Sequence, residues 1–540
     1  MRRLTALISM LFALALFNAA CANTRGATQP IDGSVTEQQT QSAKNQTQSF
    51  INVEGTDLNS KLDAALKRAR SASAQTPFWS AYSFDVRPGV AVDPNVREFH
   101  GYMSDLSGST SIFIGTSNGM TVETRNLGIF LLRDPSSGAV TRLEIYNLDR
   151  RREFGGYPVY YMDRANNEES LNFLRSFVES AGASQTRQQS RIAEHATLAL
   201  GLHDDARVSN LLKNFVRSSS ADKKIRATAI FWLGQIGGET AFLADIVRND
   251  SENKELRSHA AEAIGNSRDK IALTTLQSLY ETVSNREVKR SVIHAVSENE
   301  NKDAAFAFLL KVAKSDPDSE ARSHAVHWLG ESDSEAVVDE LMKIYASDPE
   351  QDVRRQVLHA LSEMQNPRAQ ARLLEVARSG DNAEMRRQAI HWLGEKGTDA
   401  IINELMKIYD ADGNSDVKRQ ILHAFSEMEN QRAEDKLFAV ARSDANRELR
   451  KQAIHWIGER AGQRSLELLR DTVNSSNADT EVQMQAVHAI SERPAEEAVP
   501  LLIKIARTHP NADIRRQAMH WLGESGDPRA VEFFKEVLAK

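Results

Sequence analysis

A five-residue pattern recurs eight times in the second half of the chain: a histidine, two residues, serine or glycine, and then glutamate. Successive histidines are 32 or 33 residues apart, and they are His294, His327, His359, His391, His423, His455, His488 and His520. A fixed period of this length is typical of stacked supersecondary units and not of one globular core. Weaker copies end at Gly201, Gly234 and Gly265. The pattern therefore predicts eleven units between about residue 187 and residue 540.

Each unit is predicted to be a pair of antiparallel helices. In the unit that contains His359, apolar residues recur at the helical period from Val353 to Met364, and Asp352 stands at the helix start, where a carboxylate suits the helix dipole. The segment before it, 335–346, carries a second apolar stripe, and a turn with a proline separates the two. Neither helix can bury its stripe alone, so the units must stack on one another to form a core.

The start of the second helix carries a resemblance to a known family. An acidic, an aliphatic and a basic residue open it, as in Asp352-Val353-Arg354, and a small residue and Leu-Gly or Leu-Ser follow. This signature resembles the bacterial HEAT repeat, also called the PBS-lyase HEAT-like repeat, over about two thirds of the chain. The resemblance implies a right-handed α-solenoid whose second helices line a concave face, but such motifs specify fold better than function. It also implies an inter-repeat ion ladder formed by the basic residues Arg354, Arg386, Lys418, Arg450 and Arg515.

Large and small residues alternate at the position after the histidine. The large ones are Trp328, Trp392, Trp456 and Trp521, and the small ones between them are Ala360, Ala424 and Ala489. Tryptophan accompanies glycine two residues on, and alanine accompanies serine. We expect these residues to pack in the core so that neighbouring layers interdigitate, and a pair of repeats is then the true repeating unit.

The N-terminus predicts export. Residues 1–22 have the charged start, apolar run and small residues of a signal peptide. The only cysteine, Cys21, follows them in a context that resembles a lipobox, where lipidation would make the chain a membrane-anchored periplasmic lipoprotein. The alternative is ordinary cleavage after Ala22, which would give a soluble exported product. Residues 23–55 are rich in Gln, Thr, Ser and Asn and are predicted to be a disordered linker.

Between the predicted linker and the repeats, the residue pattern changes from the helical period to short apolar runs separated by turns. A short helix is expected in 56–75, and a small antiparallel β domain of four to six strands in 76–163, because apolar runs alternate there with Gly, Ser and Pro turns. A connecting helix in 164–186 leads to the HEAT-like solenoid, 187–540. The predicted fold is thus mainly α, with a small β domain in front of the solenoid.

The candidate functional feature is a ladder of three positions spaced by four residues, which places them on one helix face away from the apolar stripe. Its members are Arg355, His359, Glu363, Arg387, His391, Glu395, Arg419, His423, Glu427, Lys451, His455, Glu459, Arg516, His520 and Glu524. Three interpretations are open: a solvated polar face, a protein-binding groove, or a metal site. One imidazole per repeat is widely spaced for zinc, although His324 and His327 lie three residues apart.

Composition narrows the function classes. A net charge of −7 with interspersed signs provides no basic field for nucleic acid. The sequence contains no nucleophile elbow, Walker loop or His-Glu-x-x-His motif, so no catalytic residue, metal or cofactor is assigned. We therefore expect a non-enzymatic exported scaffold that binds a protein partner on the concave face. The alternative is a lyase-like HEAT protein that acts on or carries a chromophore or another small molecule.

If Cys21 is lipidated, the mature protein should partition into detergent, because the several acyl chains of a lipoprotein hold it firmly at a membrane. Cys21→Ser should release the protein into the aqueous phase or leave it unprocessed. Phase partitioning and mass spectrometry of the mature N-terminus measure both. An unmodified N-terminus at Asn23 would contradict the anchor and support the soluble product.

Overall fold

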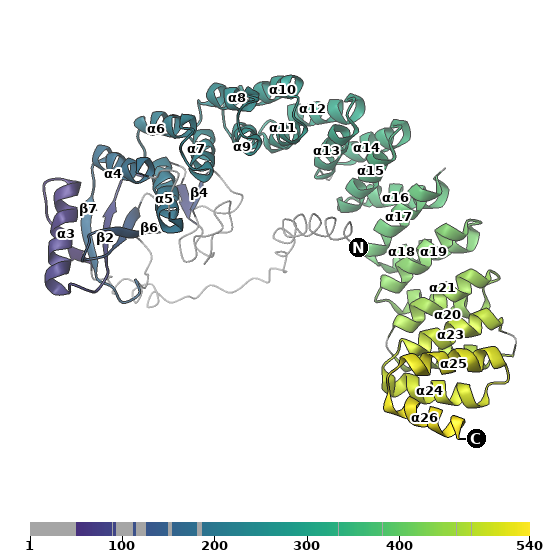
Figure 1. The fold of residues 1–540 in the computed structure, drawn as a ribbon. Coiled ribbons are helices and arrows are strands. Elements are labelled where there is room, and N and C mark those ends of the chain that lie inside the picture. Colours follow the sequence, from purple (N-terminus) through teal and green to yellow (C-terminus); the bar gives the residue numbers. More distant parts are fainter. Residues whose placement is uncertain are drawn as a thin grey trace, which may run out of the picture.

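The computed structural model describes residues 50–88, 90–92, 112–114, 126–148, 154–180, 186–332, 334–380, 382–460, 462–476 and 478–539. The predicted signal peptide, Cys21 and the predicted linker up to residue 49 lie outside these residues. The described part is a small sheet with two helices followed by an arched stack of helices (Figure 1). Within it, no helix is both long and apolar enough to cross a bilayer.

The N-terminal unit is built on a five-stranded sheet. Its elements are β1 (Ile51–Asn52), α3 (Leu58–Ala72), β2 (Phe78–Ser83), β5 (Leu127–Arg133), β6 (Val140–Asn147), β7 (Val159–Arg164) and α4 (Asn167–Glu179), with a separate pair of β3 (Val90–Val92) and β4 (Ile112–Ile114). The strand order is β1-β7-β2-β5-β6. The helices expected in 56–75 and 164–186 are therefore confirmed.

The prediction of a purely antiparallel sheet is wrong. β2, β5 and β6 are antiparallel neighbours, but β7 crosses over and pairs parallel with β2 and with β1. Turn residues indicate hairpins between strands that follow one another, whereas a parallel pair is set by a crossover that leaves no such local mark. β1 also lies inside the segment 23–55, so the linker prediction fails at its C-terminal end.

Alternation along the strands divides the sheet into two apolar faces. Phe78 and Tyr82 of β2 belong to the core that continues through α3 and α4 into the solenoid. Trp79 of β2, Phe130 of β5 and Tyr146 of β6 form a second, aromatic cluster on the other face. The side-chain period of two in a strand explains why one strand supplies both clusters.

Twenty-two helices follow in the described chain, and they form eleven antiparallel pairs, as the repeat spacing predicts. They are α5 (Arg187–Leu202), α6 (Arg207–Arg217), α7 (Lys223–Ile236), α8 (Thr240–Arg248), α9 (Lys254–Gly265), α10 (Ala272–Thr282), α11 (Arg286–Glu298), α12 (Lys302–Ser315), α13 (Ser319–Gly330), α14 (Glu335–Ser347), α15 (Gln351–Glu363), α16 (Pro367–Ser379), α17 (Ala383–Lys396), α18 (Asp399–Ala411), α19 (Ser415–Glu427), α20 (Gln431–Ser443), α21 (Arg447–Glu459), α22 (Gln463–Asn474), α23 (Thr480–Ser491), α24 (Ala495–Thr508), α25 (Ala512–Glu524) and α26 (Pro528–Leu538).

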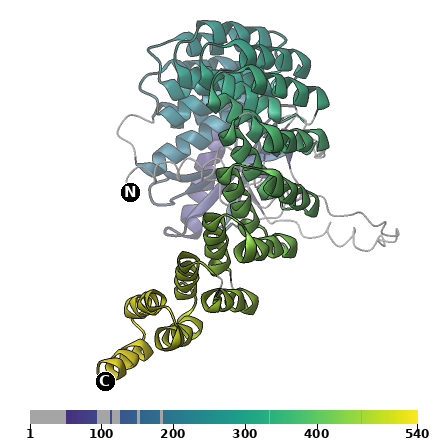
Figure 2. The same cartoon turned by 90° about the vertical axis from the view of Figure 1, so that its right-hand side faces the viewer.

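The odd-numbered helices, α5 to α25, are called inner helices, and the even-numbered ones outer helices. Figure 1 shows α9 and α11 on the inside of the arch and α8 and α10 on its outside. The view turned by 90° shows that the stack also twists, so that its C-terminal helices lead away from the arch (Figure 2). The first helix with the His-x-x-[Ser/Gly]-Glu pattern, α11, therefore lies on the inside of the arch, and the later helices with this pattern follow it as inner helices along the twisted stack.

Two kinds of contact alternate between successive inner helices from α11 onward. In a glycine junction, a glycine sits against an alanine of the next inner helix: a Cβ added to Gly330, Gly394 or Gly458 would lie 2.7, 2.9 or 2.7 Å from the Cβ of Ala360, Ala424 or Ala489. In a tryptophan junction, serine replaces the glycine and a tryptophan of the next helix lies at the contact. The predicted pair of repeats is therefore the structural unit, and its two junctions differ.

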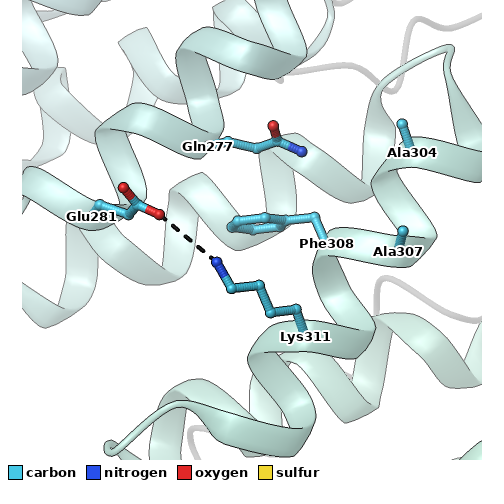
Figure 3. Close-up of a pocket in the computed structure, with 6 residues that line it drawn as sticks. All are labelled: Gln277, Glu281, Ala304, Ala307, Phe308 and Lys311. Atoms are coloured by element: carbon cyan, nitrogen blue, oxygen red, sulfur yellow. Dashed lines mark ion pairs between the residues drawn. The ribbon is translucent and has the colours of Figure 1, made fainter.

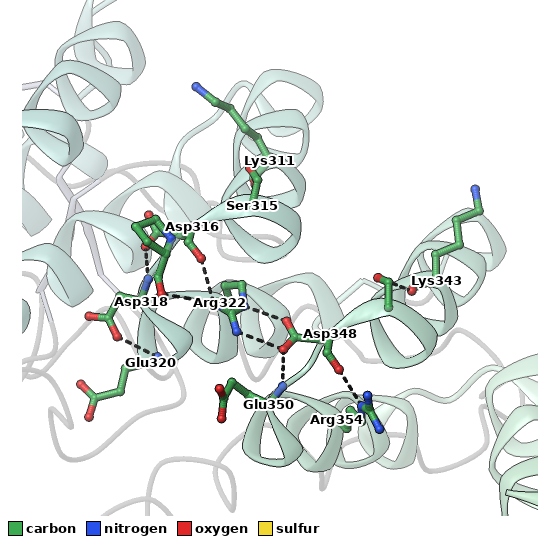
Figure 4. Close-up of polar contacts among 12 residues, drawn as sticks. Lys311, Ser315, Asp316, Asp318, Glu320, Arg322, Lys343, Asp348, Glu350 and Arg354 are labelled. Carbon is green, nitrogen blue, oxygen red and sulfur yellow. Dashed lines mark hydrogen bonds and ion pairs between the residues drawn. The ribbon is translucent and has the colours of Figure 1, made fainter. Parts of the chain in front are cut away.

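Buried arginines tie repeats together at the start of the inner helices (Figure 4). Arg322 donates to both carboxylate oxygens of Asp348, at 2.7 and 3.0 Å, and to the carbonyl of Asp316 at 2.8 Å. Arg354 donates in turn to the carbonyl of Asp348 at 2.7 Å. A turn between two helices is thus fixed from both neighbouring repeats, and the carbonyls at the end of the outer helix gain donors.

The ion ladder implied by the HEAT resemblance is only partly ionic. Arg386 forms an ion pair with Asp412 of the next turn, as Arg322 does with Asp348. Arg354, Arg450 and Arg515 donate instead to main-chain carbonyls of the turn before their own helix. Lys418 lies over the ring of Tyr409 at 5.0 Å. The shared role of this position is to hold the turn, whatever the acceptor.

A buried polar group joins the sheet to the first repeat. His203, which ends α5, is fully buried and stacks on Phe84 with 4.2 Å between ring centroids. Its Nδ1 donates to the carbonyl of Ala199 at 2.7 Å, and its Nε2 lies 2.9 Å from the hydroxyl of Ser170 in α4. Ser170 also contacts the Tyr82 hydroxyl of β2 at 3.1 Å. Burial lowers the pKa of His203 to about 4, so the ring is neutral in the folded protein.

Gly458→Ala and Gly523→Ala form a matched pair. The added Cβ at position 458 meets Ala489, whereas the one at 523, in the last inner helix, meets nothing within 4 Å. We expect Gly458→Ala to lower the free energy of unfolding by about 1–2 kcal/mol, because two backbones must separate. Gly523→Ala should raise it by about 0.5–1 kcal/mol through helix propensity. Urea denaturation measures both, and equal signs would contradict the close contact.

The free energy of unfolding should fall as the pH falls through the window from about 6.5 to about 4. The sign follows because the unfolded chain binds a proton on His203 in this window and the folded chain does not. The contribution of His203 to this loss is about 3 kcal/mol once the pH is below the window. In His203→Gln the dependence should be shallower by that amount. Denaturation of both proteins across the window tests this, and parallel curves would exclude His203 as the cause.

Candidate functional site

The predicted ladder lies on the inner helices, and its histidines are not simply solvated. From α11 to α25 each tryptophan contacts two histidines of the recurring pattern, one on its own helix and one on the preceding inner helix, with ring centroids 4.6–5.0 Å apart. The sets are His294, His327 and Trp328; His359, His391 and Trp392; His423, His455 and Trp456; and His488, His520 and Trp521. The eight histidines are therefore used in pairs across the four tryptophan junctions.

The tryptophans pack as the sequence predicts, against the core and half-buried. The Nε1 atoms of Trp392, Trp456 and Trp521 are buried and have no acceptor among the described residues. The indole ring, and not its N–H group, is thus what the junction uses. These sets of one tryptophan and two histidines are open on the side that faces solvent. At Trp392 and Trp456, for example, the His391 and His455 side chains are 43% and 41% exposed.

The basic members of the ladder are paired within their own helices. Arg355, Arg387 and Arg419 contact the acidic residue three positions earlier, Asp352, Glu384 and Asp416 respectively. Lys451 and Arg516 do the same with Glu448 and Asp513, at 3.4 and 3.0 Å. These pairs neutralise the charge at the N-terminal end of the inner helices. Their arginines are therefore not free cations aimed at a partner.

The acidic members differ from the basic ones. Glu363, Glu427 and Glu524 are exposed, and no cation of the described chain lies within salt-bridge distance of their carboxylates. Glu395 and Glu459 are 58% and 56% exposed and lie 3.8 Å from the histidine four residues earlier. These glutamates form a row at the C-terminal ends of the parallel inner helices, where the helix dipoles add partial negative charge. One edge of the inner face is therefore acidic.

A row of glutamines lies on the same helix face, three residues before six of the eight histidines, and the sequence analysis missed it. Its members are Gln356, Gln388, Gln420, Gln452, Gln485 and Gln517, all half-buried. Gln356 and Gln388 make long contacts, 3.5 Å to His359 and 3.3 Å to Glu384. The other four amides have no hydrogen-bond partner among the described residues. Six consecutive units in register were the signal that could have revealed this row.

The pair His324 and His327, considered as metal ligands from the sequence, is half-buried. Burial lowers the pKa of both imidazoles, and in His324 the nearby Arg290 acts in the same direction. Within the described residues no group of three or more potential ligands could hold a metal ion. His327 contacts Trp328, His324 stands one turn earlier on α13, and no third ligand joins them among the described residues.

A depression of about 390 Å³ lies away from the ladder, between the outer helices α10 and α12 (Figure 3). Phe308 forms its floor, Gln277 and Ala304 stand at its sides, and Lys311 faces Glu281 with 3.9 Å between Nζ and Oε1. It is wide open to solvent and contains a single ion pair. Its residues supply no grouping of nucleophile and base.

Comparison with known proteins agrees with this architecture. The family model for HEAT repeats matches residues 306–394, 372–458, 402–480 and 474–540. None of the curated proteins compared with the chain matches it. The upstream pairs, α5 to α11, continue the same stack without a break although the family model does not reach them.

Several solved structures are similar in part. A chain of the structure that describes Kap95p binding to RanGDP is 12% identical, with a TM-score of 0.38 over 69% of this chain and 59% of that chain. A chain of the complex of CpcE and CpcF of phycocyanin lyase from Nostoc sp. PCC7120 is 21% identical, with a TM-score of 0.22 over 42% and 90%. Human deoxyhypusine hydroxylase is 16% identical, with a TM-score of 0.22 over 48% and 95%.

The present chain spans about 59% of the length of the first of these structures. The family match and the register of the helix pairs agree with each other from residue 306 to residue 540. Together they show that residues 306–540 of this chain form HEAT repeats within a longer stack of helix pairs.

Proposed function

We propose that the chain is a non-enzymatic, exported scaffold that binds a protein partner on the inner face of its solenoid. The observation that carries this proposal is the set of polar rows in register on the inner helices. Four glutamine amides and several glutamates there have no partner within the described chain, although a row kept only for packing would be internally paired. Interspersed donors, acceptors and charges are what protein interfaces use for specificity.

The predicted signal peptide and Cys21 support a location outside the cytoplasm for this scaffold. With a lipid at Cys21, the sheet unit would be the part nearest the membrane and the solenoid would extend from it. The ordered group of Tyr82, Ser170 and His203 supports this arrangement, because it joins the sheet to the first repeat through a buried contact. The first repeats would then be held in a fixed orientation relative to the sheet unit.

Replacing His359, His391, His423 and His455 together by glutamine tests the proposal. We expect partner capture to weaken at least about tenfold, equivalent to about 1.4 kcal/mol. The reason is that the four substitutions change the exposed side of the histidine pairs that contact Trp392 and Trp456. The measurement is quantitative capture from solubilised membranes of the source cells by the immobilised full chain and by the variant. Circular dichroism should show the same helical content for both.

The control changes four lysines of the outer helices to glutamine: Lys343, Lys407, Lys504 and Lys535. These side chains are exposed on α14, α18, α24 and α26. We expect this variant to capture the same proteins as the parent. If the histidine variant also captures the same set in the same amounts, the inner face is not the binding surface.

A further inference from the structure

The inner face also indicates which form of protein would bind, and this step rests on the proposed function. A glutamine side chain offers a carbonyl acceptor and an NH₂ donor, which is the same pair of groups as a peptide unit. Four amides of the row, Gln420, Gln452, Gln485 and Gln517, make no hydrogen bond within the described chain. Half-buried amides in this state are suited to main-chain N–H and C=O groups of another chain, because those groups need partners whatever their side chains.

The spacing of the row fits an extended chain. Packed helices lie about 8–10 Å apart, and an extended chain advances about 3.3 Å per residue, so about three residues correspond to one repeat. The row runs from Gln356 to Gln517 over six consecutive inner helices. An extended segment of about 12–15 residues would therefore follow the whole row. A folded domain would instead reach only those amides that its own curved surface can approach.

The negative charge of the glutamate row indicates that the bound segment is positively charged. Eight glutamates in register stand at the C-terminal ends of the inner helices, about two turns beyond the position of the glutamines: Glu298, Glu331, Glu363, Glu395, Glu427, Glu459, Glu492 and Glu524. Three cations at this edge, Lys396, Arg460 and Arg493, donate to main-chain carbonyls of the preceding repeat. Arg493 also pairs with Glu497 of the following outer helix. This edge therefore keeps an excess of negative charge. The basic members of the ladder do not neutralise it, because they are paired at the N-terminal ends of the inner helices.

We propose that the inner face binds an extended, lysine- or arginine-rich polypeptide segment of about 15 residues. Its main chain lies along the glutamine row and its cationic side chains reach the glutamate row. The sets of tryptophan and histidine side chains form the surface between these two rows. They also hold the inner helices at a spacing that an extended chain can match. An acidic segment would meet repulsion from the same glutamates.

The test uses the full chain and two labelled synthetic peptides of about 15 residues. One alternates lysine with serine, and the other alternates glutamate with serine. Fluorescence anisotropy should show binding of the lysine peptide only, and its affinity should fall as NaCl rises from about 0.05 to about 0.5 M, because exposed ion pairs are screened. Equal binding of both peptides, or binding of neither, would overturn the proposal.

Two variants separate the two rows. Glu363→Gln, Glu395→Gln, Glu427→Gln and Glu459→Gln together should weaken binding at least about tenfold and reduce its salt dependence. Gln420→Ala, Gln452→Ala and Gln485→Ala together should weaken it about tenfold and leave the salt dependence unchanged, because hydrogen bonds to the main chain are lost and no charge is.

A matched control removes the same charge from the outer helices: Asp303→Asn, Glu375→Gln, Glu467→Gln and Glu532→Gln. All four carboxylates are exposed on α12, α16, α22 and α26. This variant should bind the lysine peptide as the parent does. An equal loss in control and glutamate variants would mean that net charge alone attracts the peptide, and the proposal would fail.

The outcome for the proposed function is separate. If the native partner is captured through the inner face but the lysine peptide neither binds nor displaces it, the partner presents a folded surface and only the present proposal is overturned. If the peptide binds as described but the histidine variant captures the same cellular proteins as the parent, the extended-segment site stands and the assignment of the captured partner to this face fails.

Discussion

Close contact between consecutive inner helices is the constraint on which the remainder of the solenoid depends. At the glycine junctions the two backbones approach until a single added methyl group would overlap the next helix. Because the outer helices have no such contact at these positions, the inner side of each pair is shorter and the stack curves toward it. Curvature therefore follows from residue size at one position per repeat.

The tryptophan junctions give the other half of this unit. Where serine stands in place of glycine, the indole ring of the next helix occupies the contact and two imidazole rings flank it. The histidines, which the sequence presents as part of a polar helix face, thus also take part in the packing between repeats. Their outer edges remain exposed, so one set of residues both spaces the helices and forms the floor of the inner surface.

Electrostatics along an inner helix is arranged by position. The acidic residue of the first turn favours the helix N-terminus and also pairs with the basic residue three positions later. The glutamate at the last turn stands at the unfavourable end of the dipole and has few cations nearby. A repeated cost of this kind, in eight units, is hard to explain by stability. The positively charged segment proposed above would offset this cost, because its cations would pair with the glutamates.

Much of this protein was determined by the sequence by itself. The spacing of the histidines gave the number of helix pairs, and the alternation of Trp328, Ala360 and Trp392 gave the two-repeat unit, because helical periodicity and side-chain volume are local properties. The parallel strand β7 and the strand β1 in the predicted linker could not be found in this way, since pairing partners distant in the chain leave no local mark. The ladder was found, but its paired arginines, the contacts of its histidines with tryptophan and the open Gln420 amide depend on which neighbours face each side chain. Only the tertiary structure decides that, because stacking brings residues about 32 residues apart into contact, and contact determines which polar groups remain free.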